Sequence, residues 1–142
     1  MTGDFLADTS AWARFADPGV PKERRAALIA ALRERRIWVS GVLRLEMGFS
    51  ARNAHAYASI GRELDGCAEA AIDPAVIGRA LDLQAQLVRT GHHRVPPADL
   101  VTIAAAEANG LAVLHYDKDF DVVSEHTDCA AATEWLAPRG SL

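Results

Sequence analysis

Short apolar segments typical of β-strands alternate along this chain with longer segments of helical spacing, and this alternation limits the fold more than any other feature. The clearest strand runs from Leu111 to Tyr116, directly after an almost wholly apolar helix that begins at Pro97. Alternating strands and helices are typical of a parallel sheet covered by helices. We therefore expect an α/β fold with a central, mainly parallel sheet.

Residues that favour helix ends set the expected helix boundaries. Ser40 and Asn53 are capping residues, Asp73 precedes a proline at the first helical position, and Gly91 opens a loop that reaches Pro97. The predicted strands are residues 5–7, 37–39, 67–72, 111–116 and 129–132. The predicted helices are residues 21–36, 42 onward, 54–64, 74–90, 97–108 and 120–125.

Length and composition indicate one globular domain over residues 1–142, because the chain has no internal repeat, low-complexity tract or linker. Its amino terminus lacks the features of a secretory signal, and no stretch approaches the roughly 18 apolar residues of a membrane span. We therefore expect a cytoplasmic protein that makes no membrane contact. Cys67 and Cys129 are too few and too far apart in sequence for a disulfide scaffold or a paired-thiol site.

The net charge of −4 argues against a general nucleic-acid coat protein, which needs excess positive charge. Most basic residues are arginines in short clusters, which could form a local basic rim or only solvated helix faces. The clustered arginines are Arg24, Arg25, Arg33, Arg35, Arg36, Arg44 and Arg52.

Four carboxylates stand at positions that need an explanation. Asp8 and Asp117 each follow a predicted buried strand, where functional groups gather in open parallel sheets, although either could simply cap a helix or start a turn. Glu46 has largely apolar neighbours at helical spacing, which predicts that it points toward the core. Asp99 shares its helix face with Thr102 and Ile103, or it only favours the helix dipole from the first turn.

Convergence of Asp8, Glu46, Asp99 and Asp117 would place four negative charges in a small volume, and a divalent cation would relieve their repulsion. All-oxygen ligands favour Mg²⁺ or Mn²⁺ over zinc. The spacing typical of metal ligands is absent among His92, His93, His115 and His126. His115 lies on a predicted buried strand and is expected to be a core residue. The glycine-rich signatures of nucleotide-triphosphate and dinucleotide sites are also missing from the sequence.

Five segments of the chain, in this order, resemble the PIN-domain ribonucleases, and specifically the VapC-type toxins of toxin–antitoxin pairs. They are Asp8-Thr9-Ser10-Ala11-Trp12, residues 45–52, Pro97-Ala98-Asp99-Leu100 with the alanines after it, residues 114–120, and the closing residues 134–140. The resemblance covers essentially the whole chain. It implies a three-layer α/β/α fold with a central, mainly parallel sheet.

The resemblance also implies a function and a site. It implies Mg²⁺-dependent endonucleolytic cleavage of RNA, often in a tRNA or rRNA loop, by a homodimer that a cognate antitoxin inhibits. The catalytic acids would be Asp8, Glu46, Asp99 and Asp117, with Asp8 and Asp99 as direct metal ligands and Mn²⁺ as a substitute. Thr9 or Ser10 would orient the Asp8 carboxylate or a metal-bound water, and Asp119 matches a second, more variable acid of the family's motif.

Two other functions compete with this hypothesis. The acids could form a non-catalytic binding module, in which an acidic pocket docks a basic partner segment or metal-bridged RNA. An aspartate-based phosphotransfer domain is a poorer match, because position 10 is Ser10 where the phosphatase pattern has an aspartate, and the receiver's paired acids are missing. The sequence leaves open the RNA target, the antitoxin, the number of metal ions and the role of Asp119.

Overall fold

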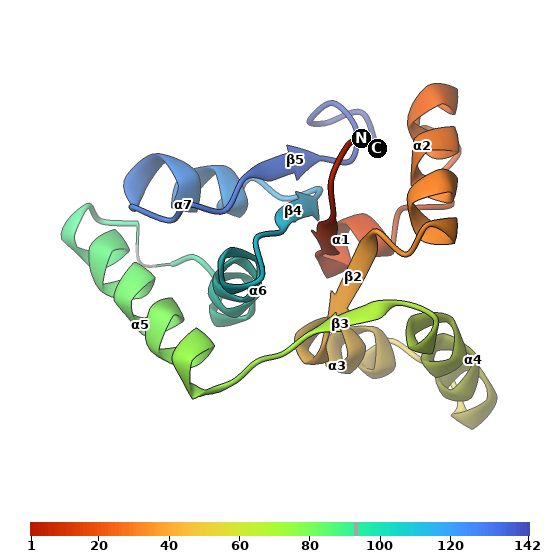
Figure 1. Ribbon diagram of the computed structural model, residues 1–142, viewed down its shortest axis with the longest axis horizontal. Coiled ribbons are helices and arrows are strands. Elements are labelled where there is room, and N and C mark those ends of the chain that lie inside the picture. Colours follow the sequence, from red (N-terminus) through yellow and green to blue (C-terminus); the bar gives the residue numbers. More distant parts are fainter. Residues whose placement is uncertain (93) are drawn as a thin grey trace.

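The computed structural model describes residues 1–92 and 94–142, and it arranges them in three layers (Figure 1). The predicted loop at residues 91–97 falls within this range except for His93, which lies outside the described residues. A central sheet has helices α5, α6 and α7 on one side and helices α1, α2 and α4 on the other. This arrangement confirms the expected α/β fold with helices on both faces of a sheet.

Within the described residues the sheet has five strands, all parallel, in the order β3-β2-β1-β4-β5. The strands are β1 (Phe5–Ala7), β2 (Ile37–Ser40), β3 (Ala68–Ala70), β4 (Ala112–His115) and β5 (Thr133–Trp135). Because β1 pairs with β2 on one side and with β4 on the other, the strand order reverses at β1. Ligands bind at the carboxyl ends of the strands beside such a reversal.

The helices begin where the capping residues predict. Side-chain oxygens of Ser40, Asn53 and Asp73 accept backbone N–H groups in the first turns of three helices. The helices are α1 (Thr9–Trp12), α2 (Lys22–Arg33), α3 (Gly41–Phe49), α4 (Ala54–Asp65), α5 (Pro74–Arg89), α6 (Pro97–Ala108) and α7 (Asp119–His126). Among the residues that the structure describes, no helix is long and apolar enough to cross a membrane.

Two hydrophobic cores form because successive strand residues point to opposite faces of the sheet. Leu6 and Val113 pack against α5 and α6, whereas Phe5, Ala7 and Leu114 pack against the helices of the other face. All five side chains are at most 2% exposed. The central strands are therefore apolar on both faces, as the sequence of β4 predicts.

Three local predictions differ from the structure. Helix α2 was predicted to reach Arg36 but ends at Arg33, because Arg35 adopts a positive φ of 57° that stops the helix. The short helix α1 follows β1 directly and was not predicted, because its four residues are too few to show a periodic pattern. The last strand was predicted at residues 129–132 but lies at 133–135. The backbone N–H groups of Cys129 and Ala130 donate to Thr127 and Glu107 instead of to a strand, so pairing begins only after them.

Candidate active site

Asp8 lies at the carboxyl end of β1 and is 5% exposed. Its Oδ2 accepts the backbone N–H of Ser10 at 2.9 Å and the Ser10 hydroxyl at 2.5 Å, so Asp8 caps α1. The same hydroxyl accepts the backbone N–H of Tyr116 at 2.9 Å, next to the end of β4. Ser10 therefore ties the Asp8 carboxylate to the neighbouring strand while Oδ1 stays available for another ligand.

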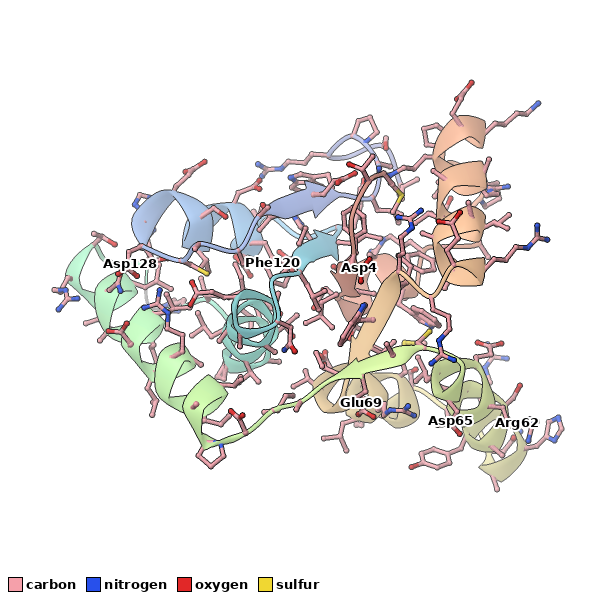
Figure 2. The ribbon with its side chains drawn as sticks, viewed as in Figure 1. Asp4, Arg62, Asp65, Glu69, Phe120 and Asp128 are labelled. Atoms are coloured by element: carbon pink, nitrogen blue, oxygen red, sulfur yellow. The ribbon has the colours of Figure 1, made fainter. Side chains whose placement is uncertain are left out.

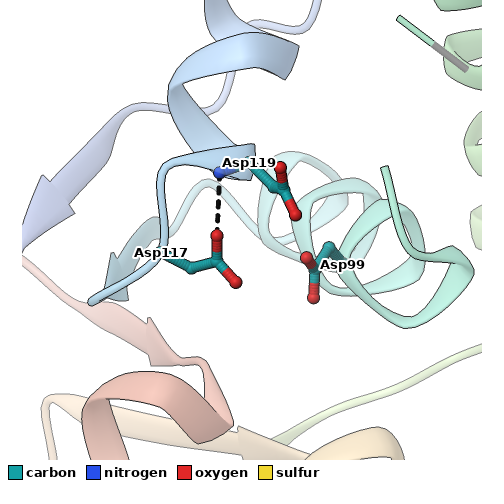
Figure 3. A group of neighbouring side chains, drawn as sticks. All are labelled: Asp99, Asp117 and Asp119. Carbon is teal, nitrogen blue, oxygen red and sulfur yellow. Dashed lines mark hydrogen bonds between the residues drawn. The ribbon is translucent and has the colours of Figure 1, made fainter. Parts of the chain in front are cut away.

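Asp117 and Asp119 lie beyond the carboxyl end of β4, at the start of α7 (Figure 3). Asp117 Oδ1 accepts the backbone N–H of Asp119 at 2.9 Å, which fixes the turn between the strand and the helix. Burial and the negative charge of Asp117 raise the pKa of Asp119, and Lys118 partly opposes this effect. These two carboxylates are thus held close together despite their like charge.

Asp99, in the first turn of α6, faces both of these acids in Figure 3 and is only 9% exposed. Its Oδ2 is buried and has no hydrogen-bond partner among the described residues. Burial, followed by the charges of Asp8, Asp117, Asp119 and Glu46, raises the pKa of Asp99 to about 8. All the predicted acids therefore act electrostatically on Asp99, which lies at the centre of the cluster.

Glu46, on α3, corrects one prediction, because its side chain is exposed and does not point toward the core. Of its apolar neighbours at helical spacing, Leu43 is buried but Phe49 is 94% exposed, so Glu46 lies toward the outward side of the helix. Partial burial and the charge of Asp8 raise the pKa of Glu46. The Thr9 hydroxyl lowers it again, although its oxygen is buried and makes no hydrogen bond of regular geometry. Glu46 thus stands at the rim of the acid cluster, on the side of Asp8.

A divalent cation suits this cluster. One carboxylate oxygen from each of Asp99, Asp117 and Asp119 lies within 4.8 Å of the other two. Burial of a carboxylate oxygen without a partner costs folding free energy. A cation would supply both the missing partner and the positive charge that offsets the repulsion between the acids. Carboxylate oxygens alone suit a hard ion such as Mg²⁺ or Mn²⁺. The unpartnered Oδ2 of Asp99 therefore points to a metal centre.

The structural roles considered for single acids are real but do not account for the whole cluster. Asp8 caps α1, Asp117 forms the turn before α7, and Asp99 lies in a first helical turn, as each alternative predicted. Each of these roles needs one oxygen or only a charge near a helix end. None of them requires that several carboxylates meet around one buried oxygen.

The Ser10 hydroxyl has a measurable role in this arrangement. We expect Ser10→Ala to destabilise the protein by about 1–3 kcal/mol, because it removes two hydrogen bonds and leaves the Tyr116 N–H without its acceptor. Any activity that depends on Asp8 should fall together with stability. Ser124→Ala on the exposed face of α7 is the matched control, and thermal unfolding measures the difference. Equal melting temperatures for the two variants would contradict this role.

The structure also settles the other polar residues that the sequence singled out. His115 is fully buried, its Nδ1 accepts the Asp117 N–H at 3.2 Å, and burial lowers its pKa, so it is the expected core residue. Many clustered arginines are engaged elsewhere: Arg24, Arg36 and Arg44 pair with acids away from the cluster. Sequence reasoning gave Asp119 too little weight, because only the turn at Asp117 brings its carboxylate to face Asp99.

Known proteins resemble this chain in sequence and in fold. The family model "PIN domain" matches residues 5–126. Ribonuclease VapC18 of Mycobacterium tuberculosis is 40% identical to the chain over 97% of its length and 98% of that protein. Ribonuclease VapC21 of the same organism is 32% identical over 99% of both chains. The likeness extends along the full length of these relatives.

Solved structures resemble the fold at lower sequence identity. The crystal structure of DNA-bound VapBC from Salmonella typhimurium has a TM-score of 0.73 at 18% identity, covering 96% of this chain and all of that one. The VapBC2 structure from Rickettsia felis has a TM-score of 0.69 at 12% identity and covers 92% and 97% of the two chains. The family model and the sequence relatives together show that the chain belongs to the PIN domain family, among its VapC ribonucleases.

Proposed function

We propose that this protein is a metal-dependent endoribonuclease, the toxin of a toxin–antitoxin pair, and that Asp8, Glu46, Asp99 and Asp117 form its catalytic site with Asp119. One observation carries the proposal: several carboxylates surround the buried Asp99 Oδ2, which has no partner among the described residues. The ribonucleases with 30–42% identity to the chain support RNA as the substrate. We propose that residues 1–142 act as a single domain.

We propose Mg²⁺ as the resident ion, with Mn²⁺ as a substitute. When bound, such an ion orients a phosphate oxygen, favours ionisation of water and offsets charge on the phosphorus in the transition state. Asp99, Asp117 and Asp119 have the spacing to hold it. Asp8, whose charge also acts on Asp99, would complete the ligand set from the β1 side through the oxygen that Ser10 does not occupy.

The protein's own groups then have distinct roles. Ser10 holds the Asp8 carboxylate in one orientation, and the turn at Asp117 holds Asp119. Glu46 lies at the exposed rim, and its raised pKa makes it a better proton acceptor near neutral pH. We propose that Glu46 takes the proton of the water that attacks the phosphorus. A P–O bond to this water oxygen forms as the bond to the ribose oxygen breaks, and the ribose oxygen takes a proton from solvent.

The family supports a proposal about the partners. VapBC-5 from Mycobacterium tuberculosis, a member of the VapBC family of toxin–antitoxin systems, has a similar fold, which supports a cognate antitoxin for this chain. We propose that the antitoxin blocks access to the acid cluster, that the toxin is a homodimer, and that its substrate is a structured RNA such as a tRNA or rRNA.

Cleavage of RNA by the purified chain, free of antitoxin, tests the proposal. We expect cleavage with Mg²⁺ or Mn²⁺ that stops on addition of EDTA, and we expect Asp8→Asn to lower the rate at least 100-fold, because it weakens the metal site without changing its shape. Asp4→Asn is the matched control, since Asp4 (Figure 2) lies just before the opposite end of the same strand, where its carboxylate accepts a hydrogen bond from the Trp38 indole. Cleavage that persists in EDTA and in Asp8→Asn would refute the proposal. RNA binding without cleavage would favour the non-catalytic binding module.

A further inference from the structure

A second, cationic site adjoins the acid cluster. A groove of about 290 Å³ lies between the end of α5 and the start of α7, and its wall includes Arg94, Lys118 and Asp119. We call this feature the basic groove. Because Asp119 also belongs to the group of three carboxylates around Asp99, the basic groove and the acid cluster share a wall.

The two cations of the basic groove are free to bind a ligand. Arg94 and Lys118 are exposed, and neither forms an ion pair within residues 1–92 and 94–142. Arg79 shows the opposite case, because its guanidinium pairs with Asp82, Glu107 and Asp128 in a network that holds α5, α6 and the loop before β5 together. The basic groove thus offers positive charge that no ion pair among the described residues neutralises.

The groove wall has a defined shape. Gly91 adopts a φ of +77° after α5, and the backbone N–H of His92 donates to Leu87 O at 2.9 Å, which closes the helix in a fixed turn. The His92 ring, which lines the basic groove, stacks on the ring of His126 at the end of α7, with centroids 3.9 Å apart. This stack joins the two elements that form the groove.

We propose that the basic groove binds a backbone phosphate of the RNA substrate, adjacent to the phosphate that is cleaved at the acid cluster. The inference rests on the proposed function and adds a substrate subsite to it. Arg94 can donate two hydrogen bonds to phosphate oxygens, and Lys118 supplies a point charge. An RNA backbone carries regularly spaced phosphates, so one phosphate can lie at the acid cluster and a neighbouring phosphate in the basic groove. An acidic peptide fits less well, because its carboxylates lack the regular spacing that places one phosphate at the acid cluster and the next in the basic groove.

Binding of RNA in the absence of metal tests the subsite separately from cleavage. A fluorescein-labelled single-stranded RNA is titrated with the protein in EDTA, where the proposed reaction cannot run, and anisotropy reports the dissociation constant. On single-stranded nucleic acid each lost phosphate contact lowers the salt slope by about 0.7, which corresponds to roughly fivefold weaker binding at 0.1 M salt. We expect this change for Arg94→Gln and for Lys118→Gln, and about 25-fold for the double variant.

Arg62→Gln is the control, because Arg62 is an exposed cation on α4, far from α7 (Figure 2), and it should leave binding unchanged. Unfolding curves should show that all four variants are folded. If the double variant binds RNA with the affinity and salt slope of the wild type, the subsite is wrong. It is also wrong if the double variant loses binding to an acidic partner peptide but still binds RNA normally. Groove-dependent binding by a protein that cleaves no RNA with Mg²⁺ would refute the proposed function and leave the subsite standing.

Discussion

Replacement of Asp99 by asparagine is expected to abolish RNA cleavage and, at the same time, to stabilise the metal-free protein. The carboxyl of Asp99 is buried among like charges, and its pKa rises to about 8 from an ordinary value of 3.8. The folded protein therefore binds a proton that the unfolded chain releases near pH 4. The protonated Asp99 thus contributes unfolding free energy that is fully present below pH 4 and is lost as the pH rises toward 8.

The expected size of the stabilisation follows from this pKa. One pH unit is worth about 1.4 kcal/mol, so ionising Asp99 by pH 8 costs the metal-free fold up to about 5 kcal/mol of unfolding free energy. Asparagine has the same shape and no charge. We expect Asp99→Asn to recover on the order of 3 kcal/mol at pH 8, which raises the melting temperature by about 10 °C in a chain of this size. At pH 4 the two proteins should differ little.

Thermal unfolding in EDTA measures this difference, and Glu63→Gln on α4 is the control that should change little, because Glu63 is exposed and forms no ion pair among the described residues. Addition of Mg²⁺ or Mn²⁺ should reverse the order, because a ligand that binds only the folded state stabilises it by mass action and Asp99→Asn has lost a ligand. A variant that melts below the wild type in EDTA at pH 8 would show that Asp99 is not destabilised by its neighbours. If Asp99→Asn cleaves RNA at the wild-type rate, Asp99 is not an active-site residue.

The sequence predicts the strand ends and helix starts around this site better than the side-chain contacts inside it. The strand ends at Asp8 and Asp117 follow from apolar runs that stop at an acid, and the helix starts follow from capping residues such as Ser40. These signals are local, since they depend on neighbours within a few positions. The order of the five strands, by contrast, depends on pairing between strands that are far apart in sequence, such as β1 with β4. The resemblance to a family implied a mainly parallel sheet but not this order.

The interior of the site depends on contacts between distant segments. Glu46 was predicted to face the core because its neighbours at helical spacing are apolar. Only Leu43 among them is buried, whereas Phe49 turns outward, and a helical pattern alone does not say which side meets the sheet. The arginine clusters gave no sign that Arg24 and Arg44 pair with acids far along the chain. The basic groove was missed for the same reason: Arg94 and Lys118 stand in two separate loops, and only the fold brings them together.

Metal binding should weaken about 50-fold when the pH falls from 8 to 6, because Asp99 is already half protonated at pH 8. A metal ion binds the carboxylate form of Asp99, so below a pKa of about 8 it must displace a proton, and the apparent affinity falls about tenfold for each pH unit. The metal-induced rise in melting temperature, measured at a series of Mn²⁺ concentrations and pH values, gives this affinity without depending on the cleavage rate.

The matched variant for this measurement is Asp99→Asn, in which the steep dependence should vanish along with much of the affinity. Asp119, whose pKa is also raised by burial and by Asp117, would leave a weaker dependence at lower pH. An affinity that is constant from pH 8 to pH 6 in the wild type would mean that no proton leaves Asp99 when the metal binds. The ion would then have to be held by the remaining carboxylates, and the partnerless Oδ2 of Asp99 would be the oxygen of a protonated acid and not a metal ligand.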